Sequence, residues 1–304
     1  MASINDTNIK EFILLGLSTI PYMQNILFVI FSVMYLVILL ANSLIILATV
    51  VDRRLHTPMY FFLRNLSIVD ICYSSTSIPR MLRDLLSDKK TISNEECVAQ
   101  MYIVLSLGVT ECMLLAVMAY DRYIAICYPL HYNTIISPTT CIITAAGVWV
   151  FGFLSSVVLV MITWSVDRCG HNKINHFMCE LPEVLSLGCS NLTSVKSIIF
   201  VLSIVILIIP ISFIIITFIK IIRAIFKISA SEGRTKAIST CASHIIVVTL
   251  FYGSAMATYI KPQPESSGDK DKFIGIFYTI VTPLLNPLVY TLRNKEVKLA
   301  LKFC

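Results

Sequence analysis

Charged residues are scarce in this chain. Only 14% of its 304 residues are Asp, Glu, Lys or Arg, whereas 57% are hydrophobic and the mean hydropathy is +0.81. Soluble domains carry roughly 25% charged residues, so the composition excludes an ordinary soluble protein. The chain also lacks a linker-like change of composition, a low-complexity tract and a convincing internal repeat. We therefore expect a single domain.

Sequence signatures of secretion and catalysis are missing as well. Residues 1–19 include Asp6 and Glu11 where a secretory signal peptide has a cationic segment and a compact apolar core, so we expect no cleavable signal. No His-Glu-x-x-His or Gly-x-Ser-x-Gly motif occurs, and the five histidines are spread over several segments of the chain. These motifs would mark a metalloprotease or a serine hydrolase. We predict that the protein is not an enzyme.

The few charges divide the chain into long apolar runs. A helix needs about 20 apolar residues to cross a hydrocarbon core of about 30 Å. Uncharged runs that contain enough residues cover 12–51, 123–166, 197–219, 237–260 and 273–292. Two more apolar stretches, 58–84 and 97–121, are interrupted only by isolated charges. The predicted fold is an all-α membrane protein with seven transmembrane helices: a tail at 1–22, the helix bundle at 23–292, and a short amphipathic helix at 293–304 on the inner leaflet.

Seven spans place the two termini on opposite sides of the membrane. Asn5 begins a glycosylation sequon in the N-terminal tail. Four cysteines (Cys97, Cys169, Cys179 and Cys189) fall on one side, and clustered cysteines favour the oxidising side. Both observations predict an extracellular N-terminus with Asn5 glycosylated. The four cysteines allow two disulfides in three pairings.

Polar groups inside the spans are candidates for function or for packing. Asp70 lies about 18 Å along a helix from Pro58, and Glu111 lies about 15 Å from Asp121, so both carboxyls reach similar depth. Facing each other, they could share a proton or hold a cation, because two bare like charges are disfavoured in a low dielectric. Alternatively, each is protonated and bonded to nearby amides. The amide of Asn42 is expected to bond to another helix.

Four segments, in order along nearly the whole chain, resemble those of vertebrate olfactory receptors, which are rhodopsin-like G-protein-coupled receptors. They are Leu55–Leu63 (LHTPMYFFL), Met118–Tyr123 (MAYDRY), Lys236–His244 (KAISTCASH) and Pro283–Tyr290 (PLLNPLVY). The modest outer loop is similar to that of the class II (tetrapod-type) group. The resemblance implies a plasma-membrane receptor of olfactory cilia that binds a small odorant and activates a stimulatory heterotrimeric G protein, raising cyclic AMP. It implies no nucleic-acid partner.

The resemblance also implies roles for particular residues. Cys97 would pair with Cys179, and Cys169 with Cys189. Sodium could occupy the polar site formed by Asp70, Glu111 and Asn286. Asp121 would restrain Arg122 in the resting state, and the sixth span would swing out on activation to admit the C-terminal helix of Gα. The residues implied in this switch are Asp121, Arg122, Tyr123, Lys236, His244 and Tyr290.

Helix spacing and the resemblance together define a predicted odorant cavity in the outer half of the bundle. Its residues are apolar or carry hydroxyls, and none is charged. An ammonium ligand would need a carboxylate to offset its desolvation, so we predict a neutral, mostly apolar volatile. The predicted lining is Val104, Leu105, Gly108, Val109, Leu202, Ser203, Ile206, Tyr252, Ala255, Met256, Tyr259, Ile276 and Thr279. For any single apolar member, plain interhelical packing is the alternative.

Two positions depart from the pattern of similar receptors. Phe218 stands eight residues after Pro210, where a tyrosine that meets Arg122 in the active state is usual, and Arg64 stands where a small polar residue is usual.

A different class of function, a transporter or channel that uses Asp70 and Glu111 as an ion path, is the alternative hypothesis. The odd number of spans and the absence of an inverted repeat speak against it.

Overall fold

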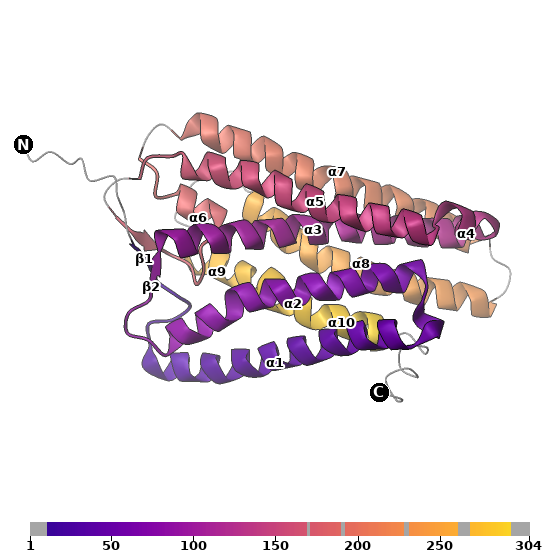
Figure 1. Cartoon of the computed structure of the whole chain (residues 1–304), viewed down its shortest axis with the longest axis horizontal. Coiled ribbons are helices and arrows are strands. Elements are labelled where there is room, and N and C mark those ends of the chain that lie inside the picture. Colours follow the sequence, from indigo (N-terminus) through magenta and orange to yellow (C-terminus); the bar gives the residue numbers. More distant parts are fainter. Residues whose placement is uncertain (1–10, 169–170, 190–191, 228–230, 261–267, 293–304) are drawn as a thin grey trace, which may run out of the picture.

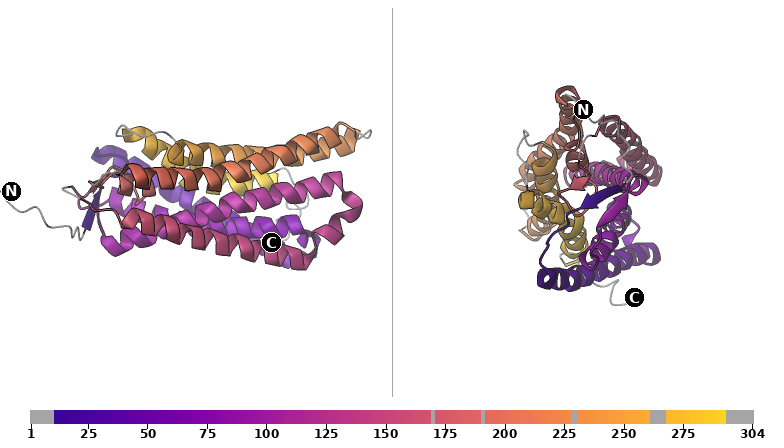
Figure 2. Two further views of the ribbon diagram at one scale, coloured as in Figure 1. Left: turned by 90° about the horizontal axis from the view of Figure 1, so that it is seen from above. Right: turned by 90° about the vertical axis from the view of Figure 1, so that its left-hand side faces the viewer.

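The chain forms an elongated bundle of long helices that run side by side (Figures 1 and 2). A computed structural model describes residues 11–168, 171–189, 192–227, 231–260 and 268–292. The predicted glycosylation site Asn5, the predicted disulfide partner Cys169 and the predicted C-terminal helix at 293–304 lie outside these residues. The two ends of the bundle are named here by what they hold: the disulfide end holds Cys97, and the Arg122 end holds Arg122.

The helices fall where the apolar runs predict them. They are α1 (Pro21–Val51), α2 (Pro58–Leu85), α3 (Asn94–Cys127), α5 (Pro138–Trp164), α7 (Thr193–Ile225), α8 (Ser231–Tyr259), and α9 (Gly268–Ile276), which continues through a π-helical turn at Phe277–Val281 into α10 (Thr282–Leu292). Six spans in the described part are long and apolar enough to cross a membrane. The remaining predicted span, α2, has 28 residues, about 42 Å of helix, but its charged residues lower its hydropathy.

Local signals explain where these helices begin. Pro21, Pro58 and Pro138 occupy the first helical position of α1, α2 and α5, where the missing proline N–H leaves no hydrogen bond unmade. Ser93 begins α3 with a capping box: its hydroxyl accepts from the Glu96 N–H at 3.2 Å, and the Glu96 carboxylate accepts from the Ser93 N–H at 3.2 Å. Such a cap stabilises a helix by about 1 kcal/mol.

Helix α3 is the central element of the bundle. It contacts α2, α5, α7 and α8, and 67% of its span is buried, compared with 22% for α1 at the periphery. The apolar side chains that α1 leaves exposed, such as Leu36 and Leu40, suit contact with lipid. Asn42 points the other way and donates from Nδ2 to the carbonyls of Ile38 at 3.0 Å and Pro283 at 3.1 Å. The expectation that this amide bonds to another helix is confirmed.

A small sheet covers the disulfide end, and the sequence analysis did not predict it. Strand β1 (Glu11–Leu14) pairs antiparallel with β2 (Thr91–Ser93) and parallel with β3 (Lys173–Ile174). Viewed from this end, β1 crosses over the helices (Figure 2). Phe12 and Leu14 point inward and are fully buried, so the sheet closes the apolar interior at this end. The short helix α6 (Leu181–Leu185) lies there too.

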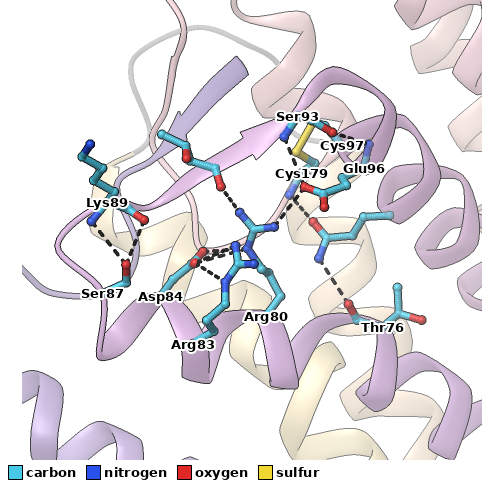
Figure 3. Close-up of polar contacts among 12 residues, drawn as sticks. Thr76, Arg80, Arg83, Asp84, Ser87, Lys89, Ser93, Glu96, Cys97 and Cys179 are labelled. Carbon is cyan, nitrogen blue, oxygen red and sulfur yellow. Dashed lines mark hydrogen bonds and ion pairs between the residues drawn. A yellow bond between two sulfur atoms is a disulfide. The ribbon is translucent and has the colours of Figure 1, made fainter. Parts of the chain in front are cut away.

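A disulfide and an arginine-centred network fix α2, α3 and the long loop together (Figure 3). Cys97 and Cys179 form the predicted disulfide, which closes a sequence separation of 82 residues. Cys189 is also disulfide-bonded. Beside Cys97, the guanidinium of Arg80 donates to Asp84 at 3.2 Å, to Glu96 at 3.4 Å and to the Thr91 carbonyl. One side chain thereby ties the end of α2 to β2 and to the first turn of α3.

At the Arg122 end, short turns connect the helices. A 3-10 turn at Arg53–Leu55 joins α1 to α2, and a second at Pro129–His131 leads into α4 (Tyr132–Ile135) before α5. The carboxylate of Asp52 accepts from the backbone and guanidinium of Arg54, which lowers its pKa. The guanidinium of Arg64 lies over the Phe61 ring, 5.4 Å from its centroid.

Candidate functional site

A cavity lies toward the disulfide end, between α2, α3, α5, α7, α8, the π-helical turn and α6. The cavity volume is about 60 Å³. Apolar side chains dominate its wall, and four hydroxyl-bearing residues interrupt them. The lining residues are Tyr73, Val104, Leu105, Gly108, Val109, Leu159, Leu181, Ser203, Ile206, Leu207, Phe251, Ala255, Tyr259 and Tyr278.

The structure brings eight of the thirteen predicted cavity residues together around this one space. They are Val104, Leu105, Gly108, Val109, Ser203, Ile206, Ala255 and Tyr259. The other five, Leu202, Tyr252, Met256, Ile276 and Thr279, do not line it. Tyr252 instead donates its hydroxyl proton to the Cys112 carbonyl at 2.8 Å, and the Cys112 thiol donates back at 3.0 Å. That exchange joins α8 to α3 beside the cavity.

Six lining residues were not predicted: Tyr73, Leu159, Leu181, Leu207, Phe251 and Tyr278. Leu207 directly follows the predicted residue Ile206, and Phe251 lies four residues, about one helical turn, before Ala255. A wider helix face would have included both. Leu181 comes from a loop whose path depends on the Cys97–Cys179 disulfide, and helix periodicity does not predict such a path. Tyr73 could have been found from its position three residues after Asp70.

A buried carboxylate stands directly behind the cavity wall, and the sequence analysis missed it. Glu180 follows Cys179 and is only 3% exposed. Its Oε1 accepts hydrogen bonds from the hydroxyls of Tyr259, at 3.1 Å, and of Tyr278. The prediction of a lining without charge holds for the lining residues themselves, but a charge-bearing group lies one hydrogen bond away.

His176 lies on the other oxygen of this carboxylate. Its Nε2 is 3.4 Å from Glu180 Oε2, its side chain is fully buried, and its ring stacks on Phe177 with centroids 4.4 Å apart. Burial, with a smaller contribution from Lys272, lowers the pKa of His176 to about 4. The imidazole is therefore neutral at pH 7, and the contact with Glu180 is not an ion pair under those conditions.

A polar cluster lies in the core, where α2, α3 and α10 meet. Asp70, Glu111 and Asn286 are almost completely buried. Asn286 Nδ2 donates to both oxygens of Asp70 at 3.0 Å and to Glu111 Oε1 at 3.4 Å. The two carboxyls therefore share one amide, as their predicted common depth implied.

The free oxygens of this cluster fit a compensating cation. Glu111 Oε2 and Asn286 Oδ1 are buried and accept no hydrogen bond, and both are hard oxygen donors of the kind that alkali and alkaline-earth cations prefer. Two carboxyls and a carbonyl oxygen would hold Na⁺ or share a proton. Either would supply the positive charge that two adjacent buried carboxylates require.

At the Arg122 end, Asp121 and Arg122 do not bond to each other among the described residues. Asp121 Oδ1 accepts from the Tyr132 hydroxyl at 2.7 Å, while Asp121 Oδ2 and Arg122 Nε are buried without a hydrogen-bond partner. The structure thus differs from the expected restraint of Arg122 by Asp121. Tyr132, from α4, satisfies the carboxylate instead, and sequence spacing alone does not indicate this partner.

His244 connects four helices beside Arg122. Its Nδ1 lies 2.8 Å from the Tyr290 hydroxyl on α10, and its Nε2 lies 3.1 Å from the Leu115 carbonyl on α3. Its ring stacks on Phe218 of α7, with centroids 5.7 Å apart. The structure thereby brings His244 and Tyr290 together, two of the predicted switch residues.

The structure shows no contact of Tyr123 or Lys236 with the other predicted switch residues among the described side chains. The ring of Tyr123 faces outward, with Lys220 Nζ 5.3 Å from its centroid and its hydroxyl 3.4 Å from that of Tyr128. Lys236 belongs to α8, but its side chain lies outside the described residues.

Comparison with known proteins decides the family. The sequence profile of olfactory receptors matches residues 31–303. The chain belongs to the olfactory receptor family. It is 47% identical over 302 residues to olfactory receptor 2B6 of Mus musculus, covering 99% of this chain and 96% of that protein. It is similarly 46% identical over 298 residues to putative olfactory receptor 2B3 of Homo sapiens (98% and 95%) and 48% identical over 302 residues to human olfactory receptor 13D1 (99% and 87%).

Family membership settles the architecture and the broad class of function. Olfactory receptors are seven-helix, G-protein-coupled membrane receptors and not enzymes, so α2 counts as a membrane span of this multi-pass receptor despite its charges. The cavity, the Asp70–Asn286–Glu111 cluster and the His244 contacts therefore lie in one receptor bundle, at successive depths along α3.

Proposed function

We propose that the receptor binds a small, neutral, mostly apolar volatile in the cavity and then activates a heterotrimeric G protein of the stimulatory, olfactory type. The observation that carries this proposal is the cavity itself, whose wall is apolar except for hydroxyls and lies against α3. A ligand with a permanent charge would lose its hydration there without a direct counter-charge. Each buried methylene contributes about 0.8 kcal/mol, so one added carbon should improve potency about fourfold until the space is filled.

The proposed orientation puts the disulfide end outside the cell. Disulfides persist in oxidising compartments, and the Cys97–Cys179 bond lies at the cavity end. An odorant would then enter from the outer side, and the plasma membrane of olfactory cilia is the proposed location. The Arg122 end would face the cytoplasm and the G protein.

The proposed switch lies at that end. Arg122 Nε has no hydrogen-bond partner among the described residues, so this nitrogen is available to a new acceptor. Asp121, Tyr123, Lys236, His244 and Tyr290 are the other residues proposed for the switch. Movement of α8 would change the His244 contacts to α3 and α10. The Gα C-terminal helix would then enter a groove between the helices.

The Asp70–Asn286–Glu111 cluster would hold one compensating positive charge, either Na⁺ or a shared proton. A titration of agonist potency against NaCl and pH separates the two: Na⁺ dependence at fixed pH supports the metal, and pH dependence at fixed Na⁺ supports the proton. Asp70→Asn should abolish either dependence. A ligand-independent ion current lost in Asp70→Asn would instead support an ion path and contradict the receptor proposal.

Two matched glycine variants test whether the cavity is the ligand site. Gly108→Leu puts a side chain into the cavity, whereas Gly147→Leu adds one on α5, where nothing lies within 4 Å of a new Cβ. In cells that report cyclic AMP, we expect volatiles to activate the native receptor and Gly147→Leu, and Gly108→Leu to lose at least tenfold in potency at equal surface amount. Equal responses of the two variants, or a primary amine as the best agonist with the alcohol of the same skeleton silent, would contradict the proposal.

A further inference from the structure

The hydroxyls of two tyrosines at the loop side of the cavity already donate their protons to a neighbouring side chain. Tyr259, from α8, and Tyr278, from the π-helical turn, both line the cavity, and both donate to the same oxygen of Glu180. A phenolic hydroxyl has one proton to donate and also accepts hydrogen bonds. With the proton directed to Glu180, each hydroxyl can offer only lone pairs to a molecule in the cavity.

Glu180 is held in place to act as the common acceptor. It directly follows the disulfide-bonded Cys179, whose backbone N–H donates to the Gln100 side chain at 2.9 Å, and Gln100 in turn donates to the Thr76 carbonyl at 3.2 Å. These contacts anchor the loop to α3 and α2. Two hydroxyl donors on one oxygen favour the ionised carboxylate, which in turn keeps both tyrosine protons directed to it.

His176 lies at the other oxygen of the carboxylate. Its Nε2 is 3.4 Å from Glu180 Oε2, whereas the tyrosine contacts use Oε1. Lys272, itself a buried cation, lies near His176. Gly275 on α9 leaves room for the imidazole, because a Cβ there would come within 2.9 Å of Nε2.

We infer that Glu180 sets the hydrogen-bond polarity of the odorant cavity, so that the receptor favours ligands that donate a hydrogen bond, alcohols or phenols, over carbonyl compounds and ethers of the same skeleton. An alcohol can donate its proton to a lone pair of either tyrosine hydroxyl. A carbonyl or ether oxygen has no proton to donate, so it cannot form a hydrogen bond with that lone pair. This inference rests on the proposed function of the cavity and names the ligand class within it.

The other two hydroxyls of the wall do not change this preference. Tyr73 and Ser203 also line the cavity, and neither is one of the two hydroxyls that donate to Glu180 Oε1 in the described contacts. A hydroxyl can both donate and accept, so each can serve an alcohol and a ketone alike. The discrimination therefore comes from the Tyr259–Glu180–Tyr278 group.

The test compares matched volatiles on matched variants. Straight-chain primary alcohols, aldehydes, methyl ketones and methyl ethers of equal length are applied to cells that report cyclic AMP, with surface amount measured for each variant. On the native receptor we expect the alcohols to be at least tenfold more potent than their carbonyl and ether counterparts, which corresponds to about 1.4 kcal/mol. Equal potency across the classes would overturn the inference.

The variants ask whether Glu180 and the tyrosines cause the preference. Glu180→Met removes the acceptor at similar side-chain length, which frees both tyrosine protons to face the ligand, so the alcohol preference should shrink about tenfold. Tyr259→Phe and Tyr278→Phe remove the acceptors one at a time and should reduce alcohol potency more than ketone potency. If Glu180→Met fails to reach the surface, the two Phe variants decide the question alone.

Ser203→Ala serves as the control, since it removes a cavity hydroxyl outside this group and should affect both ligand classes equally. An unchanged alcohol-to-ketone ratio in Glu180→Met and both Phe variants would overturn the role of this group while leaving the cavity as the ligand site. Silence toward every volatile at normal surface amount would instead overturn the proposed function, and with it this inference.

Discussion

The imidazole of His244 lies 2.8 Å from the hydroxyl of Tyr290. This contact joins α8 to α10, and the second ring nitrogen of His244 reaches the backbone of α3. Both residues are buried, so their hydrogen bond is shielded from water and its loss would leave polar groups unpaired at a cost of about 1–3 kcal/mol. Movement of α8 at the Arg122 end therefore has to break or replace these contacts.

Phe218 is the residue through which this contact can be tuned. Its ring stacks on His244 from α7, and Arg122 Nε lies buried in the same end of the bundle without an acceptor. Phe218→Tyr adds a hydroxyl that can accept from Arg122, and we expect higher basal or maximal cyclic AMP. Phe213→Tyr is the control, because Phe213 is exposed on the same helix. A lower or unchanged signal in Phe218→Tyr would argue against a contact between position 218 and Arg122.

The close approach of α5 to α3 depends on Gly152. A Cβ at this position would lie 2.9 Å from the Ser106 carbonyl oxygen and would collide with the Thr110 side chain. Gly152→Ala should therefore lower stability by about 1–3 kcal/mol, visible as a lower melting temperature of the purified receptor in detergent. Gly147→Ala, on the open face of the same helix, should leave stability unchanged or raise it slightly. Similar melting temperatures for the two variants would show that α3 and α5 can move apart without a loss of folding free energy, and would contradict this prediction.

His176 should make the disulfide end sensitive to acid. Its pKa is lowered to about 4 in the folded receptor by burial and by Lys272, compared with about 6.5 in an unfolded chain. Between these values only the unfolded state binds the proton, so stability is complete above pH 6.5 and falls as the pH drops toward 4, by roughly 3 kcal/mol at most. Melting temperatures measured across this range should fall less steeply in His176→Gln. His131→Gln, an exposed histidine at the other end, should keep the native slope.

Much of the fold follows from where charges are missing from the sequence. Each predicted span overlaps a helix, because a membrane permits little besides helices and closed barrels. The bounds agree less well: α1 begins at Pro21 and α5 at Pro138, well inside the apolar runs 12–51 and 123–166. The three-stranded sheet is different. β1, β2 and β3 are two to four residues long, too short for an alternating pattern, and they pair across segments that only the folded chain brings together.

The site was predictable where it depends on helix faces and not where it depends on loops. Gly108 and Ser203 follow from helical spacing, and they line the cavity. Leu181 lines the cavity and Glu180 lies behind its wall, on the loop that the disulfide ties to α3, and no periodic pattern indicates that position. For the same reason Tyr132, from a short helix in a connection, was missed as the partner of Asp121.

The central claim is that a volatile bound in the cavity signals through the Arg122 end. Its most direct test is the cyclic AMP dose–response of Arg122→Ala beside the native receptor, with surface amount measured in the same cells and Arg223→Ala, an exposed cation at the same end, as the control. We predict that Arg122→Ala reaches the surface but gives no odorant-driven cyclic AMP, while Arg223→Ala responds nearly normally. A normal dose–response from Arg122→Ala would contradict the account.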